Sequence, residues 1–181
     1  MTNSHHLYEL IDLCIRGNHQ ATEQLFRTYA GKMMTVCRRY APTTELAEDW
    51  LQEGFVKVFT NLHKFERQGS FEGWIRKIFI NHALRELTKN PPINEDLDQV
   101  ISIGTEEQDP LSKLNEEHIL SLVQALPDGY RAVFNLFVIE GYSHKEISEM
   151  LEIEESTSRS QLVKARKMLQ EKLSTNNKLA V

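Results

Sequence analysis

Hydroxyl, amide and cationic side chains recur at helical spacing near the end of the sequence, where they can bind a polyanion. The set comprises Ser156, Thr157, Arg159, Ser160, Gln161, Lys164 and Lys167. Arginine and glutamine form paired hydrogen bonds with base edges, whereas lysine, serine and threonine commonly contact phosphates. The pattern therefore predicts a helix that binds DNA in the major groove. The alternative is an ordinary helical hairpin with a solvated basic face.

Two predicted helices position these side chains. The buried face of the second helix, with spacings of four, three and four residues, should consist of Ser158, Leu162, Ala165 and Leu169. Ser143 and Glu146 have the spacing of a capping box, in which each side chain satisfies a backbone N–H group at a helix start. Residues 152–154 are too few for anything but a turn. Residues 140–173 thus predict a helix-turn-helix whose later helix is the recognition helix.

Four further helices are predicted in the first half of the chain, where apolar residues recur every three or four positions. They are a helix over residues 7–16, a second that Asn18 caps and Pro42 ends, a third that begins at Thr43 and Thr44, and a fourth that Ser70 caps and that runs to about residue 89. Residues 63–69 predict a loop between the last two helices.

An acidic segment separates these helices from the C-terminal ones. Residues 91–112 contain six Asp or Glu and no Lys or Arg. This composition, without sustained periodicity, predicts a solvated linker. Helices over residues 114–126 and 130–140, with a turn at residues 127–129, should then precede the helix-turn-helix.

The predicted fold class is all-α, with two small helical domains joined by the acidic linker and a C-terminal helix-turn-helix. The predicted boundaries are 1–90 for the first domain, 91–113 for the linker, 114–174 for the second domain and 175–181 for a tail. The chain has 181 residues of which 40% are hydrophobic, enough for two hydrophobic cores.

The net charge of −5 is unusual for a protein that binds DNA unaided. Neutralisation of phosphates supplies most of the non-specific affinity for DNA, so a larger partner should supply most of the binding affinity. No apolar run approaches the roughly 18 residues that a membrane span requires, and the first residues do not resemble a signal peptide. A cytoplasmic location is therefore expected.

No arrangement of residues indicates catalysis. The seven histidines are scattered, and H-E-x-x-H, the phosphate-binding glycine loop and G-x-S-x-G are all missing from the sequence. Cys14 and Cys37 lack the spacing of metal ligands and are best interpreted as small apolar residues. We therefore expect no enzyme activity, no metal site and no cofactor.

Several short motifs together resemble the sigma-70 family of bacterial sigma factors. For regions 2.2 to 2.4 they are Leu51-Gln52-Glu53-Gly54-Phe55, His63-Lys64-Phe65-Glu66 and the run from Phe71 to Ile78; for region 4 they are Leu126-Pro127, Glu140-Gly141-Tyr142-Ser143, Lys145-Glu146-Ile147 and Lys164-Ala165-Arg166. Because only these two regions are present, the chain is similar to the extracytoplasmic-function (ECF) group. The ordered set is more specific than any one motif.

The resemblance implies a sigma factor without an active site, which binds core RNA polymerase, directs it to −35 and −10 promoter elements and assists promoter melting. Residues implied to bind the polymerase clamp helices are Asp49, Gln52, Glu53 and Lys57. Those implied to bind the melted strand at −10 are Trp74, Arg76, Lys77, Asn81 and Arg85. The loop over residues 65–70 would form the wall of a pocket for a flipped base. Trp74 is equally interpretable as a hydrophobic-core residue.

The −35 element would be bound as a duplex by the polar set of the recognition helix defined above. The resemblance further implies contact with the polymerase flap and regulation by an anti-sigma factor that covers both domains. The sequence departs from the pattern at Glu152, where many relatives have glycine, and at Glu154, where they have a better helix cap.

Two other functions remain open on the sequence. A stand-alone helix-turn-helix regulator would bind duplex DNA tightly without polymerase, usually as a dimer, but the chain has no obvious dimerisation helix. A helical adaptor that binds only protein would be indifferent to the loss of Arg159 or Lys164.

Overall fold

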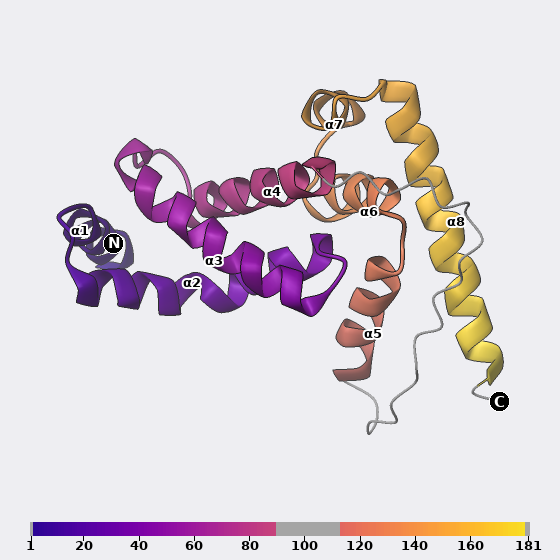
Figure 1. Cartoon of the computed structure of the whole chain (residues 1–181), viewed down its shortest axis with the longest axis horizontal. Coiled ribbons are helices and arrows are strands. Elements are labelled where there is room, and N and C mark those ends of the chain that lie inside the picture. Colours follow the sequence, from indigo (N-terminus) through magenta and orange to yellow (C-terminus); the bar gives the residue numbers. More distant parts are fainter. Residues whose placement is uncertain (1, 90–112, 180–181) are drawn as a thin grey trace. The chain divides into compact units, whose positions relative to one another are not determined.

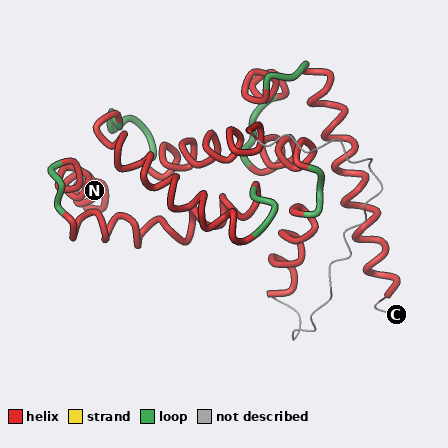
Figure 2. The backbone as a smooth tube through the Cα atoms, in the orientation of Figure 1, coloured by secondary structure: helices red, strands yellow, loops and turns green. Residues whose placement is uncertain are grey.

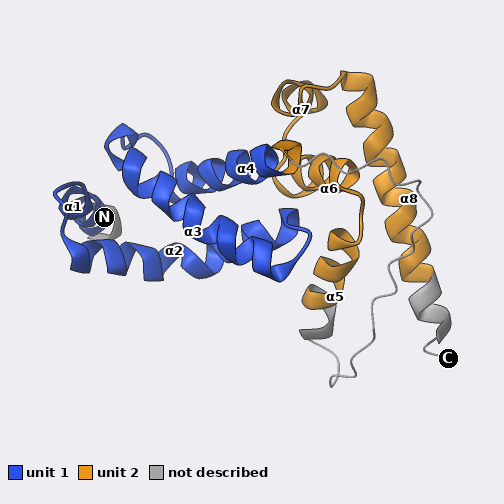
Figure 3. Cartoon of the chain, in the orientation of Figure 1, with its two compact units in different colours: residues 1–86 blue, residues 87–181 orange. Residues whose placement is uncertain are grey.

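The computed structural model describes residues 2–89 and 113–179, and every element in those ranges is helical (Figures 1 and 2). This confirms the all-α fold class. The chain divides into two compact units, residues 1–86 and residues 87–181 (Figure 3). The predicted linker lies outside the described residues except for Lys113, with which α5 begins. No helix in the described ranges is long and apolar enough to span a membrane.

The described part of unit 1 consists of four α-helices and a single 3₁₀ turn. They are α1 (Thr2–Ile15), α2 (His19–Tyr40), α3 (Thr44–Asn61), η1 (Leu62–Lys64) and α4 (Phe71–Lys89). Asn18 caps α2 by accepting the N–H of Ala21, and Thr43 caps α3 by accepting that of Leu46. The sequence predicted the cap at Asn18 and a helix start at Thr43 and Thr44. The first helix begins earlier than predicted, and a 3₁₀ turn occupies the first part of the predicted loop.

The core of unit 1 is rich in aromatic rings. The α2 residues Leu25, Tyr29, Met33, Cys37 and Tyr40 are buried as their spacing predicts. Phe26, which the same stripe placed inward, keeps 37% of its surface exposed and rests against the Phe55 ring at 4.6 Å between centroids. Burial raises the pKa of the Cys37 thiol to about 12, which agrees with a role as an apolar residue.

Gly54 lets α3 and α4 approach each other. It is buried, and a Cβ at this position would lie 2.3 Å from the Phe79 ring of α4. Phe79 is 1% exposed and packs edge-on against Phe55, so its ring has no space to retreat. The close contact therefore depends on the missing side chain.

Unit 2 is built from α5 (Lys113–Gln124), α6 (Asp128–Phe134), the π-helix η2 (Asn135–Ile139), α7 (His144–Leu151) and α8 (Glu155–Leu179). The turn predicted over residues 127–129 was wrong: Pro127 precedes the first residue of α6, and Asp128 and Gly129 belong to that helix. The helix predicted over residues 130–140 changes to π geometry at Asn135. Helix α8 continues into residues predicted as a tail.

Arg131 holds the first part of unit 2 together from within. Its guanidinium is 2% exposed and donates to the backbone carbonyls of Gln124 and Leu126 at 2.9 and 3.0 Å, and to the carboxylate of Asp128. The carbonyls of Gln124 and Leu126 lie at the C-terminal end of α5, where backbone carbonyls have no hydrogen-bond partner within the helix. Arg131 therefore fixes the end of α5 against α6. Sequence analysis did not identify this residue.

Candidate nucleic-acid interface

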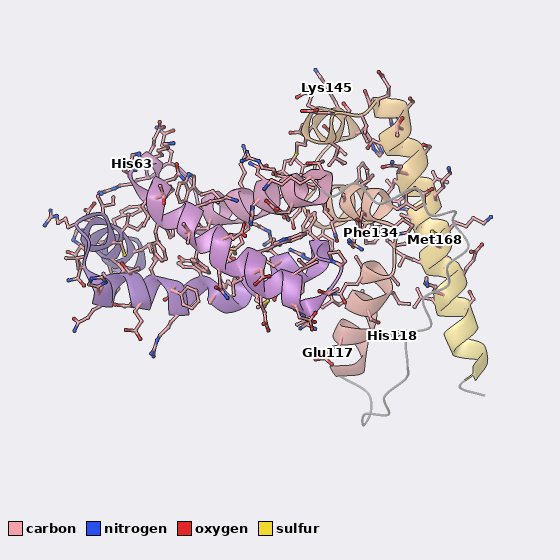
Figure 4. The ribbon with its side chains drawn as sticks, viewed as in Figure 1. His63, Glu117, His118, Phe134, Lys145 and Met168 are labelled. Carbon is pink, nitrogen blue, oxygen red and sulfur yellow. The ribbon has the colours of Figure 1, made fainter. Side chains whose placement is uncertain are left out.

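Helices α7 and α8 form the predicted helix-turn-helix. The capping box at the start of α7 is complete: Ser143 Oγ accepts the N–H of Glu146, and the Glu146 carboxylate accepts the N–H of Ser143 at 2.8 Å. At the other end of α7, Glu152 adopts a left-handed conformation with φ of 53°. Its N–H and that of Ile153 both donate to the carbonyl of Ser148, which closes the turn into α8. Lys145 projects from the first turn of α7 into solvent (Figure 4).

The buried face of α8 matches the predicted one. Ser158, Leu162 and Ala165 are buried and Leu169 is half-buried, and α8 packs on both α6 and α7. Ser158 is fully buried, and its Oγ lies 2.9 Å from Nδ1 of His144 at the start of α7. The backbone and side-chain contacts thus give α8 one defined orientation about its axis.

His144 belongs to a stack that sequence analysis missed. Its ring lies parallel to that of Phe137 with 4.4 Å between centroids, and the Arg166 guanidinium lies 5.9 Å from the Phe137 centroid. Desolvation lowers the pKa of His144, and the charge of Arg159 lowers it further. The neutral imidazole is therefore the form that the folded unit favours.

The opposite face of α8 presents most of the predicted DNA-contacting residues together. Those exposed are Ser156, Arg159, Ser160, Lys164 and Lys167. Thr157 and Gln161 are half-buried on one flank. The Gln161 amide packs against α6, where a Cβ on Gly129 would lie 3.3 Å from its Nε2. Gln161 is thus the member of the set that faces the protein.

Each cation of this face has a partner within unit 2. Arg159 is paired with Glu155 one turn earlier, Lys167 lies 3.8 Å from Glu171, and Lys164 Nζ lies 5.9 Å from the centre of the Tyr130 ring. The first two pairs are exposed and therefore weak. A phosphate or base that binds this face competes with those partners. The carboxylate of Glu155 also places negative charge beside this polar face.

In unit 1, three of the four predicted polymerase-binding residues of α3 are exposed on one face, and the fourth is half-buried. Asp49, Gln52 and Glu53 are exposed on one face of the helix. Lys57 is half-buried, and its ammonium contacts Nδ1 of His82 on α4. The predicted solvent-facing role of Lys57 therefore does not match its position.

His82 is the centre of a polar junction between α3 and α4. The ring is 3% exposed; its Nε2 lies 3.1 Å from a Glu53 carboxylate oxygen, and its Nδ1 lies 3.7 Å from a Glu86 oxygen. Glu53, His82 and Glu86 each offer one ligand atom within 4.8 Å of the others, an arrangement that metal sites use. Because the Lys57 ammonium already lies against the imidazole, we interpret the group as an ionic junction.

The predicted −10 residues of α4 divide between two sides of the helix. Trp74, Lys77, Asn81 and Arg85 are spaced by three, four and four residues and so share a face. Lys77, Asn81 and Arg85 are exposed on it. Arg76 is half-buried and lies nearly half a turn away from that face. The structure therefore brings four of the five residues together.

Trp74 belongs both to the hydrophobic core and to this surface. Its ring is half-buried, stacks on Phe71 at 5.7 Å with an interplanar angle of 18°, and contacts Phe65 at 5.5 Å. Phe65, at the start of the loop predicted to wall a base pocket, is itself 7% exposed and points inward. Later in the loop, Arg67 pairs with Asp12 of α1. Trp74 is thus a partly exposed ring that packs on two buried rings.

Two family models match the sequence. The model of sigma-70 region 2 matches residues 25–91, and that of sigma-70 region 4 matches residues 116–169. The first match includes α3 and α4, and the second includes the helix-turn-helix.

Similar proteins cover nearly the whole chain. The ECF RNA polymerase sigma-E factor of Haemophilus influenzae is 26% identical over 178 residues, covering 91% of this chain and 93% of that protein. The ECF RNA polymerase sigma-E factor of Escherichia coli K12 is 25% identical, with 91% and 92% covered.

Two solved structures share the fold. The sigma factor RpoE of Bartonella quintana, in complex with the anti-sigma factor NepR, has a TM-score of 0.55 and 20% identity, covering 84% of this chain and 96% of that one. CnrH, in complex with the cytosolic domain of CnrY, has a TM-score of 0.50 and 21% identity, covering 92% and 96%.

Proposed function

The chain belongs to the ECF group of the sigma-70 family of RNA polymerase sigma factors, and from that premise we propose how its residues divide promoter recognition between the two units. The observation that carries the proposal is the α8 helix. One face is fixed by burial and by the His144–Ser158 contact, and the other presents Arg159 and Ser160 to solvent. A rigidly held helix with such a face suits sequence recognition in the major groove.

In unit 2, the exposed face of α8 binds the −35 element. Arg159 contacts base edges, and Lys164, Lys167 and Lys145 contact phosphates. Ser156, Thr157 and Ser160 add hydroxyl contacts. The Gln161 side chain packs against Gly129 of α6 and contacts DNA only if it rotates away from that residue. Each well-formed base contact contributes about 1–3 kcal/mol of discrimination, so a few contacts suffice when polymerase supplies the remaining affinity.

In unit 1, α3 binds core RNA polymerase and α4 binds the melted −10 strand. Asp49, Gln52 and Glu53 supply the polymerase surface, and Lys57 contributes through the His82 junction. Trp74 offers the exposed part of its ring as a platform for an unstacked base, with Lys77, Asn81 and Arg85 along the strand. Arg76, on the other side of the helix, does not contact the same strand.

The partners of this chain follow from its family. Core RNA polymerase and promoter DNA are the obligatory ones, and the protein acts in the cytoplasm where they are found. An anti-sigma factor is the expected regulator, as in the complex of RpoE with NepR. Catalysis of RNA synthesis belongs to the polymerase, and we assign this chain no catalytic role.

Transcription from a promoter library tests the proposal. Core polymerase with the full chain should start transcription at new sites that share two upstream motifs, and core polymerase alone should not. Arg159→Ala should degrade the −35 motif and leave the −10 motif intact. Arg27→Ala is a matched control because Arg27 is also an exposed arginine paired with a glutamate four residues earlier. If the protein binds duplex DNA without polymerase and creates no starts, it is a stand-alone regulator and the proposal is wrong.

A further inference from the structure

Val163 is an apolar residue at the centre of the polar face of α8. Its side chain is 66% exposed. The buried residues Ser158 and Ala165 lie on the opposite side of the helix, because Val163 is five residues after the first and two before the second. Single exposed apolar residues are common, so exposure alone says little. Val163 is unusual because it lies among the polar residues of the exposed face of α8.

The four residues Ser156, Arg159, Ser160 and Val163 have the spacing i, i+3, i+4 and i+7. A homeodomain recognition helix contacts its site through residues at this same spacing, because such residues form a narrow strip along one side of a helix. If Arg159 and Ser160 lie in the major groove, Val163 therefore lies there one turn further along.

The chemistry of valine limits what it can recognise. It has no hydrogen-bonding group, and the 5-methyl group of thymine is the apolar feature that the major groove displays. Its branched side chain is stiff about χ1, so its methyl groups are presented in few orientations. Valine is also a weaker helix former than the alanine or lysine that an exposed position usually favours. Neither helix stability nor packing within unit 2 accounts for it.

We propose that Val163 contacts the 5-methyl group of one thymine in the −35 element and thereby selects a T·A pair at that position. The inference rests on the proposed function of α8. It adds an apolar contact to a surface whose other predicted contacts are polar or charged.

Removal of single methyl groups from the DNA tests this contact. The full chain is assembled with core polymerase, and binding is measured on a promoter selected from the library. Each thymine of the −35 element, on either strand, is replaced in turn by deoxyuridine, which lacks only the 5-methyl group. We expect one replacement to weaken binding about fourfold, the effect of one buried methyl-sized group. Val163→Ala should weaken binding to the parent promoter similarly and be insensitive to that replacement.

Val138→Ala is the matched control. Val138 is an exposed valine of the same unit, on η2 and outside the α8 face, so the variant should keep the full effect of deoxyuridine. If every deoxyuridine promoter binds like its parent, or if the loss persists in Val163→Ala, the inference is wrong while the proposed function stands. If the polymerase selects no upstream element at all, the proposed function fails and Val163 has no thymine to contact.

Discussion

Nδ1 of His144 and Oγ of Ser158 lie 2.9 Å apart and join the two helices of the helix-turn-helix. The serine is fully buried, and the imidazole is stacked on Phe137. The turn between α7 and α8 is only three residues long, so this contact and the packing of Ile147 and Leu162 define the angle at which the recognition helix is presented.

Ser158→Ala should loosen that angle. The variant removes one buried hydrogen bond and should lower the free energy of unfolding of unit 2 by about 1 kcal/mol. Hydrogen exchange of α7 and α8 amides in the full chain is the appropriate measurement, because Trp50 and Trp74, the only tryptophans, both belong to unit 1. Ser174→Ala, which removes an exposed hydroxyl of the same helix, should have no such effect. Equal protection in both variants would contradict a structural role for the contact.

His144 should make the stability of unit 2 depend on pH. Desolvation holds its pKa in the folded unit below the ordinary value of about 6.5. The unfolded chain therefore binds a proton first as the pH falls, so stability is complete above about pH 6.5 and is lost as the pH drops through the lowered pKa. Hydrogen exchange protection measured between pH 5 and pH 8, a range of about one unit or more on either side of that value, should show this loss. His144→Gln should flatten it; an unchanged profile would assign the dependence to other groups.

Glu155→Gln should strengthen binding to the −35 element. The variant releases Arg159 from its pair and removes one negative charge from the side of α8 that is proposed to face DNA. An exposed pair of this kind contributes roughly 0.2–1 kcal/mol, so affinity should rise by a factor of about 1.4 to 5. Competition binding by the polymerase complex at two salt concentrations gives the measurement. Glu117→Gln makes the same charge change on α5 and should leave affinity unaltered. A fall in affinity for Glu155→Gln would mean that the carboxylate positions Arg159 for DNA.

Gly54→Ala should destabilise unit 1 by about 1–3 kcal/mol, the usual effect of overpacking. The added methyl group would overlap the buried Phe79 ring. Gly31→Ala provides the opposite case, because Gly31 lies in α2 with open space around it and alanine favours a helix by about 0.5–1 kcal/mol. Tryptophan fluorescence during urea unfolding follows unit 1 in both variants. Similar urea midpoints for Gly54→Ala and Gly31→Ala would show that α3 and α4 can move apart without loss of stability.

Glu152→Gly should stabilise unit 2. Glu152 holds a left-handed conformation that costs an L-residue roughly 1–2 kcal/mol and costs glycine little. Glu152→Ala removes the same charge but keeps the strained backbone, so only glycine should increase hydrogen exchange protection of α7 and α8. Were alanine equally stabilising, the charge of Glu152 and not its backbone would be the unfavourable feature.

Local chemistry made the helix starts and the buried face of α8 predictable from sequence. Asn18, Thr43 and Ser143 cap helices through contacts within three residues, and the spacing of Ser158, Leu162 and Ala165 determines a helix face wherever the helix packs. The family motifs then gave the function, because they combine several such local patterns in a fixed order.

Contacts between distant residues account for what the sequence did not predict. Lys57 looked solvent-facing on α3, but His82 lies 25 residues later in the chain and meets it across the helices. Gln161 was predicted to lie on the polar face of α8, but its side chain packs against Gly129 of α6. Arg131 is unremarkable in sequence and becomes structural only because the end of α5 surrounds it. The proline at residue 127 marked a boundary correctly, but proline is also common at the start of a helix, as it is at the start of α6.

The junction of Glu53, Lys57, His82 and Glu86 has a thermodynamic consequence. Glu53 is a proposed polymerase contact on α3 and lies beside His82 of α4. In the same helix, Asn81 and Arg85 on either side of His82 in sequence are the residues proposed to contact the −10 strand. A partner that draws Glu53 away changes the charge around the His82 ring. Free-energy linkage is reciprocal, so whatever polymerase binding does to the affinity of α4 for the strand, strand binding does equally to the affinity of α3 for polymerase. A coupling that strengthens strand binding in the polymerase complex therefore also means that release of the promoter weakens the binding of the sigma factor to the enzyme.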